Sequence, residues 1–459
     1  MEHKMRKIAA VAAAVTVVTT ASAFAMSPAG QELINSIFSY FQNDQAIEIT
    51  SLKELDKYNE EIGKSVSKDG VTLTLDNVAA DDNFIHIFYT VKSDQEPLYE
   101  GDRPNVAVYN DKMNMYLDIC GVINGIFPQY NNHSTQDGYF VDNHTYKAVE
   151  KYNISSEEIP DRFRVELFCN AVHKDEKFRE KEVMKKLYQD GGYETITEAE
   201  RAEVLYISAE IDKSKTQVET VTKEINTKLP WCNGTVEKIV FSPFGNQMVI
   251  STPPAVDQDR NPAFVDSCFA LYDENGTCLD MLNTDLCGSS DGSLRNSFEF
   301  LKASADTKQL KFVPIKFNER GDIGRTEYPI GQYPITCKFS DYGSIVVTDI
   351  RISDGKVEID YYKDGYVLYD PAFQLLDDNG GNAEPGGKLG CVLYTDVHHD
   401  TNSYTARYVY DKLDNNGEPV PPDESVSADA LKKSFTTLGF VDQSYIELDF
   451  DRAITVGLR

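Results

Sequence analysis

Few residue groupings in this chain have the types and spacing that chemistry requires. The run His-His-Asp at 398–400 combines imidazoles with a carboxylate, which is a set that binds transition metals or exchanges protons. Its surroundings are polar, and a solvated loop is the interpretation that the sequence favours. His133 and His144 lie in a loop-like stretch without the H-E-x-x-H spacing of zinc proteases. His86 alternates within a strand pattern, which predicts a partly exposed strand residue.

The eight cysteines do not form a C-x-x-C pair, which argues against zinc ribbons and thioredoxin-like redox motifs. Four of them fall within one stretch of the chain, and an exported protein could join them in one or two disulfides. Buried free thiols are an equally good interpretation, and the sequence leaves both open. The four are Cys232, Cys268, Cys278 and Cys287.

Acidic turns raise the question of calcium, because hard oxygen ligands suit that ion. The turns that end at Gly276, Gly380 and Gly417 lack the acidic or amide residue that an EF-hand loop needs at its first position. Irregular calcium sites built from loops stay open, as does a hydrolase that uses paired carboxylates. The stretch GSSDGS at 288–293 is interpreted as a turn rather than as the G-x-S-x-G nucleophile elbow of a hydrolase. The sequence therefore assigns no catalytic, cofactor-binding or metal-binding residue, and no cofactor.

The charge of the chain narrows the classes of partner. There are 45 basic and 74 acidic residues, which give a net charge of -29, and the hydrophobic content is 41%. That hydrophobic content is sufficient for packed cores, so we expect a folded protein. The negative charge argues against nucleic acid and anionic lipid, because their phosphates would be repelled.

Internal repeats organise the chain after its N-terminal part. The stretches FALYDENGT (269–277) and FQLLDDNGG (373–381) share the pattern F-x-L-x-D-acid-N-G. Upstream of them, residues 236–252 parallel residues 347–362, and residues 75–91 form a looser third copy. Repeats of this kind predict a duplicated structural unit.

Each copy alternates apolar and polar residues, as in Val357, Ile359 and Tyr361, which is typical of strands with one buried face. Asp-Gly at 354–355 and Asn-Gly at 275–276 predict hairpin turns between such runs. We therefore predict a mainly β protein made of tandem immunoglobulin-like β-sandwich domains. It would have an N-terminal apolar segment and a few added helices. The expected parts are a helical lead-in (27–68) and domains at 69–228, 229–342 and 343–459.

Three short helices are expected as additions to the sheets. Ser51 and Glu54 form a capping box that predicts a helix through about Val66. A second helix is predicted at about 175–188 as an insertion between strands, and a third at 428–434. The insertion is rich in charge and is interpreted as a solvated face, with partner binding as the alternative.

The first 26 residues predict export. A basic flank precedes an uncharged apolar run from Ile8 to Met26, and small residues near its end form cleavage-like sites. The run is either a cleaved signal peptide or a membrane anchor, since it just reaches the length of a bilayer-spanning helix. Both interpretations place the later residues outside the cytoplasm. A following amphipathic helix at 28–41 would dock on the folded body or lie on the membrane surface.

The order of these parts resembles a known family. The apolar segment ending in SPAG, the stretch SIFSYF, the segment SLKELDKYNEEIGKSV and the hairpin DGVTLTLDNVAADDNFIHIFYTVKSD are similar to the domain of unknown function 4179 family of Firmicutes envelope proteins. The resemblance covers about residues 7 to 170 and implies immunoglobulin-like modules after it. It supplies no catalytic or binding residues.

The sequence thus predicts a non-enzymatic extracytoplasmic protein that binds or senses an envelope or extracellular ligand or protein. It would be membrane-associated through Ile8 to Met26 if that segment is retained. The alternative is a secreted hydrolase or carbohydrate-active enzyme.

Overall fold

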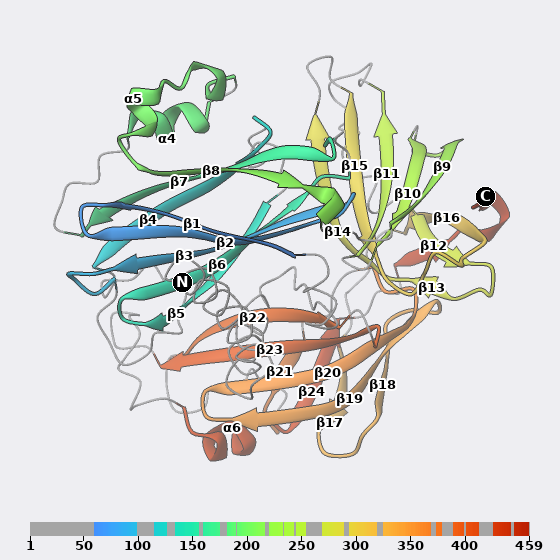
Figure 1. Cartoon of the computed structure of the whole chain (residues 1–459). Coiled ribbons are helices and arrows are strands. Elements are labelled where there is room, and N and C mark those ends of the chain that lie inside the picture. Colours follow the sequence, from blue (N-terminus) through green and yellow to red (C-terminus); the bar gives the residue numbers. More distant parts are fainter. Residues whose placement is uncertain are drawn as a thin grey trace, which may run out of the picture.

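The protein is mainly β, with several antiparallel sheets and a few short helices (Figure 1). The computed structural model describes residues 59–98, 114–125, 134–155, 159–174, 181–189, 191–215, 220–232, 234–242, 245–253, 269–288, 293–318, 325–368, 373–378, 389–398, 401–412, 426–441 and 445–458. The apolar segment from Ile8 to Met26, the helix expected at 28–41 and the capping box at Ser51 lie outside these residues. Among the described residues, no helix is both long and apolar enough to cross a bilayer.

The first two-sheet unit pairs a five-stranded sheet with a three-stranded one. The larger sheet has the order β1-β2-β3-β6-β5 and the smaller one β4-β7-β8. These strands are β1 (Asn59–Lys68), β2 (Val71–Ala80), β3 (Phe84–Ser93), β4 (Met115–Ile123), β5 (Ser134–Asp142), β6 (Thr145–Asn153), β7 (Arg162–His173) and β8 (Leu205–Asp212). Their inner faces share one apolar core, which includes Leu73, Ile87, Tyr152 and Leu167.

The second unit has the larger sheet β14-β15-β11-β10-β9 and a smaller sheet built around β12 and β16. Its strands are β9 (Val221–Lys228), β10 (Thr235–Phe241), β11 (Asn246–Thr252), β12 (Phe269–Asp273), β13 (Cys278–Leu279), β14 (Met281–Gly288), β15 (Leu294–Phe300) and β16 (Gln309–Phe317). The last strands of the chain, β25 (Ile446–Leu448) and β26 (Ile454–Gly457), pair with β16 and complete this unit.

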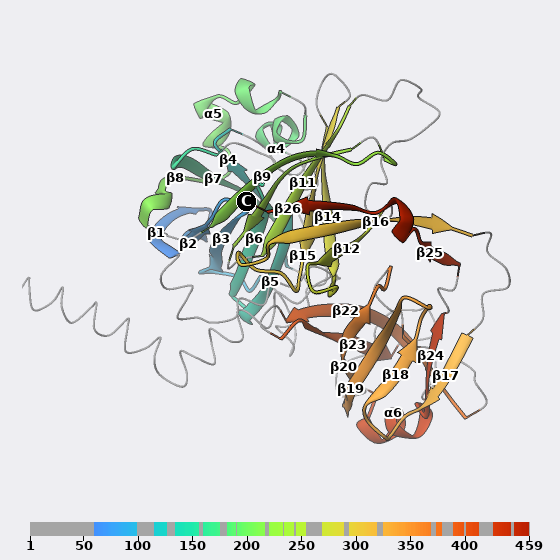
Figure 2. The same cartoon turned by 90° about the vertical axis from the view of Figure 1, so that its right-hand side faces the viewer.

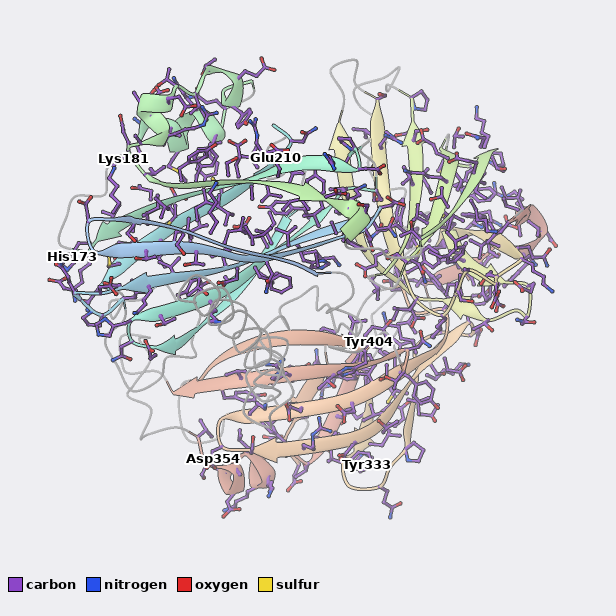
Figure 3. The ribbon with its side chains drawn as sticks, viewed as in Figure 1. His173, Lys181, Glu210, Tyr333, Asp354 and Tyr404 are labelled. Carbon is purple, nitrogen blue, oxygen red and sulfur yellow. The ribbon has the colours of Figure 1, made fainter. Side chains whose placement is uncertain are left out.

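The third unit has the larger sheet β18-β19-β20-β23-β22 and the smaller sheet β17-β24-β21. Its strands are β17 (Arg325–Pro329), β18 (Ile335–Lys338), β19 (Gly343–Ser353), β20 (Lys356–Gly365), β21 (Gln374–Leu376), β22 (Leu389–His398), β23 (Ser403–Lys412) and β24 (Thr437–Val441). Figure 3 places Tyr404 on the side of this unit that faces the second unit, while Asp354 and Tyr333 lie at its far end.

The three units repeat one strand arrangement. In each larger sheet, three consecutive strands form a meander, and two later strands are added in reverse order. In each smaller sheet, a strand that follows the meander lies beside a later strand (β4 with β7, β12 with β16, β21 with β24). The repeated sequence stretches therefore occupy matching places, with a hairpin in one sheet followed by a strand in the other.

The third strand of the smaller sheet is exchanged between the second and third units. In the first unit this strand is β8, which follows β7 along the chain and pairs with it. In the second unit the chain leaves β16 and enters β17, which pairs with β24 of the third unit. After β24 the chain returns as β25 and β26, which fill the matching place beside β16 (Figure 2). We call this feature the strand exchange.

The predicted boundaries differ from the observed sheets at three points. The first sheet begins at Asn59 rather than near residue 69, and β17 and β18 precede the boundary expected at residue 343. The last strands, β25 and β26, belong to the second unit although they were assigned to the third domain (343–459). The strand exchange causes the last difference. The pattern of neighbouring residues does not show that β25 and β26 pair with β16.

The predicted helix through Val66 is wrong over residues 59–66, where the structure has β1. Ile62 and Val66 are four residues apart, a spacing that suits a helix, yet both pack on the core of the first unit from a strand. A bulge between Glu61 and Lys64, with Gly63 at a φ of 58°, brings them onto that core. The turn at Asp69 and Gly70 then pairs β1 with β2, and cross-strand hydrogen bonding outweighs helix propensity here.

Two predicted helices are found. Helix α6 (Ala428–Ser434) has the predicted bounds, and the Ser427 hydroxyl accepts a hydrogen bond from the backbone N–H of Ala430 at its start. Helix α4 (Glu182–Leu187) lies within the predicted insertion, and α5 (Glu198–Arg201) follows it. Helix α4 packs against the smaller sheet of the first unit (Figure 1), where its residues Val183, Met184 and Leu187 are buried.

Candidate ligand pocket

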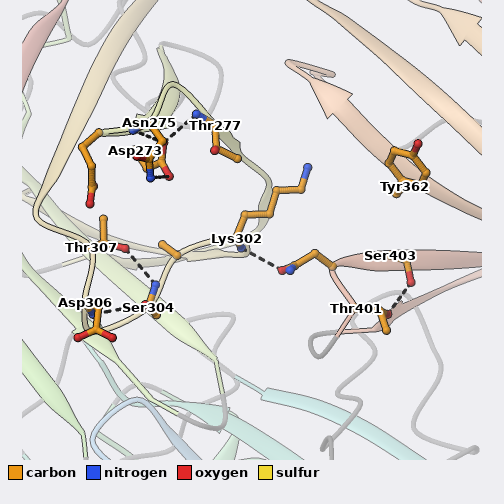
Figure 4. Close-up of a pocket in the computed structure, with 13 residues that line it drawn as sticks. Asp273, Asn275, Thr277, Lys302, Ser304, Asp306, Thr307, Tyr362, Thr401 and Ser403 are labelled. Carbon is orange, nitrogen blue, oxygen red and sulfur yellow. Dashed lines mark hydrogen bonds between the residues drawn. The ribbon is translucent and has the colours of Figure 1, made fainter.

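A pocket of about 770 Å³ opens where the second and third units meet. That volume lies within the range of about 300 to 1,000 Å³ that is typical of small-molecule sites. One wall comes from the β12–β13 turn and the loop after β15, and the other from β20 and the β22–β23 hairpin (Figure 4). The lining residues are Asp273, Glu274, Asn275, Thr277, Lys302, Ala303, Ser304, Asp306, Thr307, Tyr362, Thr401, Asn402 and Ser403.

The wall from the second unit is a tight, internally bonded turn. The Asp273 carboxylate accepts hydrogen bonds from the backbone N–H groups of Asn275 and Thr277 at 2.9 and 2.7 Å. Gly276 has a φ of 81°, which closes the turn as the Asn-Gly signal predicts. Glu274 in turn accepts from the backbone N–H of Lys308. These bonds fix the backbone, so this wall is largely formed before a ligand enters.

The wall from the third unit carries an exposed aromatic ring. Tyr362 is 40% exposed, while its neighbour Tyr361 is 1% exposed and points into the core of the third unit. This alternation is the one expected of β20, and it directs Tyr362 outward. Thr401 and Ser403 share a hydrogen bond of 2.7 Å on the same side of the pocket (Figure 4).

A buried ionic network joins the two walls. The Lys302 ammonium donates to Asp280 Oδ1 at 2.9 Å and to the carbonyl of Lys363 in the third unit at 2.7 Å. The Tyr404 hydroxyl of the third unit donates to Asp280 Oδ2 at 2.8 Å. The backbone N–H of Lys302 also donates to Asn402 Oδ1 at 3.1 Å. Because these bonds cross the junction, they hold the two halves of the pocket in register.

The lining of the pocket is polar and acidic. It contains three carboxylates, from Asp273, Glu274 and Asp306, and one ammonium, from Lys302. That ammonium is already paired with buried Asp280. The lining therefore leaves no free positive charge for an anionic ligand.

A second polar cluster fixes the helical insertion to the first unit. Glu166 on β7 is fully buried and accepts hydrogen bonds from the hydroxyls of Tyr193 and Tyr206. Arg164 and Arg201 lie beside the same carboxylate, at 3.4 and 3.9 Å. Tyr193 and Arg201 belong to the insertion, so this cluster links the insertion to the smaller sheet and is structural.

We expect Glu166→Gln to lower the free energy of unfolding by about 2 kcal/mol, because hydrogen bonds to a charged group are lost from a buried site. Glu198→Gln is the matched control, since Glu198 pairs with the same Arg201 but its side chain is 90% exposed, and such pairs contribute little. Urea unfolding measures both variants. Equal losses for the two variants would contradict the prediction.

The first and second units also meet through buried polar groups. Lys151 on β6 and Glu299 on β15 form an ion pair of 3.1 Å, with side chains 7% and 3% exposed. Asn83 donates to the carbonyls of Val240 and Gly245, at 3.2 and 2.8 Å. Asp81 accepts a hydrogen bond from Ser242, and burial raises the pKa of this carboxyl to about 6. This interface fixes the first two units against each other.

His86 lies in this buried region, so the prediction that it is partly exposed is wrong. It is 1% exposed, and its burial together with the nearby Lys151 lowers its pKa to about 3. The strand alternation of β3 places it on the face that would be open in an isolated sheet. The second unit covers that face, which is a contact that the local pattern does not contain.

Glu150 is a buried carboxyl inside the first unit. The Tyr152 hydroxyl donates to it, and a Cβ added to Gly121 would lie 2.9 Å from its Oε2. Burial raises the pKa of Glu150 to about 8, so the folded protein keeps this carboxyl protonated at neutral pH. The site is closed and lies away from the pocket.

The stability of the protein should therefore depend on the protonation of Glu150. Between pH 4.5 and about 8 the unfolded chain releases this proton and the folded chain keeps it, so stability falls as the pH rises. Glu150→Gln mimics the protonated form, and we expect it to raise the free energy of unfolding by about 4 kcal/mol near pH 8. Below pH 4.5 the gain should vanish. Urea unfolding across this pH range measures it, and a gain that is the same at every pH would contradict the assignment.

The other histidines that the structure describes do not gather in one place. His398 ends β22, and its Nε2 lies 2.8 Å from the Thr405 hydroxyl, while 399–400 lie outside the described residues. His144 contacts the carbonyl of Ser93, and His173 lies 2.8 Å from Glu96. His133 is also outside the described part of the chain. In the described ranges, groups of three or more His, Cys, Asp or Glu side chains that could hold a metal ion are not found.

Five cysteines within the described residues are free thiols, and four of them are buried: Cys120, Cys169, Cys278 and Cys337. Cys232 is half-buried. Of the four residues considered for disulfides, Cys232 and Cys278 are therefore unbridged. Cys268 and the side chain of Cys287 lie outside the described part.

Sequence reasoning did not find the pocket. Lys302, Tyr362 and Asn402 come from three distant parts of the chain, and none stands in a motif. The Asn-Gly turn at 275–276 was recognised as a hairpin signal, but its place beside the third unit depends on the junction between units.

Comparison with known proteins bears on the N-terminal part of the chain, which includes β1 to β3. Residues 1–93 match the family model of DUF4179, a domain of unknown function. The DUF4179 match thus covers the segment before Asn59 and the first meander, and it ends where β3 ends, at Ser93. The pocket and the strand exchange lie beyond it.

Other comparisons add little to the DUF4179 match. A search of curated proteins finds no match. Among solved structures, the conserved domain protein from Bacillus anthracis is similar at 13% identity and a TM-score of 0.34, covering 63% of this chain and 88% of that one.

Proposed function

We propose that this chain is a non-enzymatic extracytoplasmic protein that binds a polar ligand in the pocket between its second and third units. The observation that carries this proposal is a polar pocket whose two walls come from different units and are held by the Asp280, Lys302 and Tyr404 network. A site that is formed before the ligand arrives lowers the entropy that binding costs.

We further propose that each unit is an immunoglobulin-like sandwich with one extra N-terminal strand. Without that strand, the larger sheet of the first unit has the order β2-β3-β6-β5, and the smaller sheet has the order β4-β7-β8. These orders correspond to the ABED and CFG sheets of constant-type immunoglobulin domains. The other two units agree when the exchanged strand is counted in the G position. Such sandwiches commonly carry binding sites on their loops and hairpins.

Binding is favoured over hydrolysis by the state of the carboxylates. Asp273 and Glu274 accept backbone hydrogen bonds that shape the pocket wall. The described carboxyls whose pKa is raised by burial, which is the property that suits a general acid, are Asp76, Asp81 and Glu150 in the first unit. The paired-carboxylate enzyme is the second candidate, because three acidic side chains do line the pocket.

Native mass spectrometry of the full chain with a soluble digest of its host's cell wall tests both candidates. We expect the wild-type protein to bind wall fragments whose masses are unchanged when they are released. Tyr362→Ala should lose this binding. Phe450→Ala is the matched control, because Phe450 is a similarly exposed aromatic residue (45%) outside the pocket. Shortened products would support the hydrolase, and the absence of any bound mass would overturn the binding proposal.

We propose an extracytoplasmic location for the protein because of the apolar run between Ile8 and Met26. This run would be a signal peptide or a membrane anchor. N-terminal sequencing and intact mass of the protein from membrane and medium fractions test this. A new terminus near Met26 in the medium indicates release, and an uncut chain in the membrane indicates an anchor. An uncut chain found only in the cytoplasm would overturn the proposed location.

A further inference from the structure

We infer that the ligand of the pocket is a short saccharide without acidic groups. This inference rests on the proposed function and narrows it to one ligand class. It is carried by the exposed ring of Tyr362 opposite a wall of short polar side chains, together with the absence of a free cation among the residues that line the pocket.

Tyr362 provides a flat apolar surface inside an otherwise polar pocket. Its ring is 40% exposed, and among the residues that the structure describes no hydrogen-bond partner engages its hydroxyl. A saccharide ring has an apolar face of C–H groups that packs on such an aromatic ring, while its hydroxyls need polar partners at its edges. A purely polar small molecule would gain nothing from this exposed ring.

The rest of the lining supplies hydrogen-bond donors and acceptors from both units. Thr277, Ser304 and Thr307 offer hydroxyls, and the Thr401 and Ser403 pair adds two more from the third unit. A hydroxyl both donates and accepts, so it suits the hydroxyls of a sugar in either direction. A ligand in the pocket would therefore meet hydroxyl groups from two units.

The charge of the pocket selects among saccharides. The Asp306 carboxylate lines it and receives no side-chain partner from the described residues, whereas Lys302 is occupied by Asp280 and the carbonyl of Lys363. A uronic acid or a phosphorylated sugar would bring a negative charge next to Asp306, Asp273 and Glu274, and like charges disfavour binding.

Calorimetric titration of the full chain in a mild detergent tests this, with a chitin tetrasaccharide as the neutral probe and a galacturonic acid tetramer as the acidic one. We expect the neutral probe to bind and the acidic one to bind at least about tenfold more weakly. Tyr362→Ala should lower the affinity for the neutral probe about tenfold, and Tyr362→Phe should keep the wild-type affinity. Asp306→Asn should raise the affinity for the acidic probe about fivefold, because it removes one negative charge from the pocket.

The outcomes separate this inference from the function on which it rests. Equal affinity for both probes would overturn the exclusion of acidic sugars. No binding of either probe, with sugar-free wall fragments still captured by the wild type and lost in Tyr362→Ala, would overturn the saccharide class and leave the proposed binding function in place. No binding of probes or wall fragments would overturn both. Phe450→Ala should leave the affinity for the neutral probe unchanged.

Discussion

A chain that ends at residue 441 should fail to form a stable second unit. This truncation removes β25 and β26, with Ile446, Leu448, Val456 and Leu458, all of which are buried. Burying one such side chain contributes about 1.5 to 3 kcal/mol, so the loss is about 6 kcal/mol or more, comparable to the whole stability of a typical domain. It also uncovers Leu310 and Phe312 on β16, which are fully buried in the complete chain.

Hydrogen exchange measured by mass spectrometry tests this prediction unit by unit. We expect β9 to β16 to lose protection while the first unit keeps it, because the first unit has its own third strand, β8. A synthetic peptide of residues 442–459 should restore the protection when it is added to the truncated chain. Full protection of β16 without the peptide would show that the strand exchange is dispensable.

Lys151→Met should destabilise the protein by about 3 to 5 kcal/mol, because it removes the ammonium that pairs with the buried Glu299 carboxylate. Lys151 also lies over the ring of Phe84, with its ammonium 3.9 Å from the ring centre, so the same change removes a cation–π contact. Urea unfolding of the full chain measures the loss.

Two further variants show whether the charge is the cause. Lys92→Met is the matched control, since Lys92 pairs with Asp94 at the surface and its side chain is 58% exposed, so we expect little change. Combining Lys151→Met with Glu299→Gln should recover much of the loss, because the unpaired charge is then gone. If the double variant is as unstable as the two single losses added together, the ion pair is not the cause.

The sequence patterns were sufficient where structure is local. Helix α6 was predicted with its observed bounds, and the structure shows Ser427 as its N-cap. The hairpin at 354–355 joins β19 and β20 as its Asp-Gly pair predicts, and Gly355 has a φ of 67°. The three-fold repeat likewise corresponds to three units with one strand order.

The failures have a common physical cause, which is contact with residues outside the segment whose pattern was considered. Ile62 and Val66 fit a helix or a bulged strand equally well, and pairing with β2 decides between them. His86 is buried by the second unit. The pocket combines Lys302 with Tyr362 from another unit, so its residues share no spacing that a sequence could display.

The buried thiols have a consequence for the redox chemistry of this protein. Burial raises the pKa of Cys120, Cys169, Cys278 and Cys337, so their sulfurs stay protonated and closed to solvent. Thiolates are the species that oxidants and disulfide exchange attack. Packing and strand pairing, rather than disulfides at these four sulfurs, therefore hold the surrounding parts of the three units together. Packing of these four thiols therefore requires neither their oxidation nor their reduction.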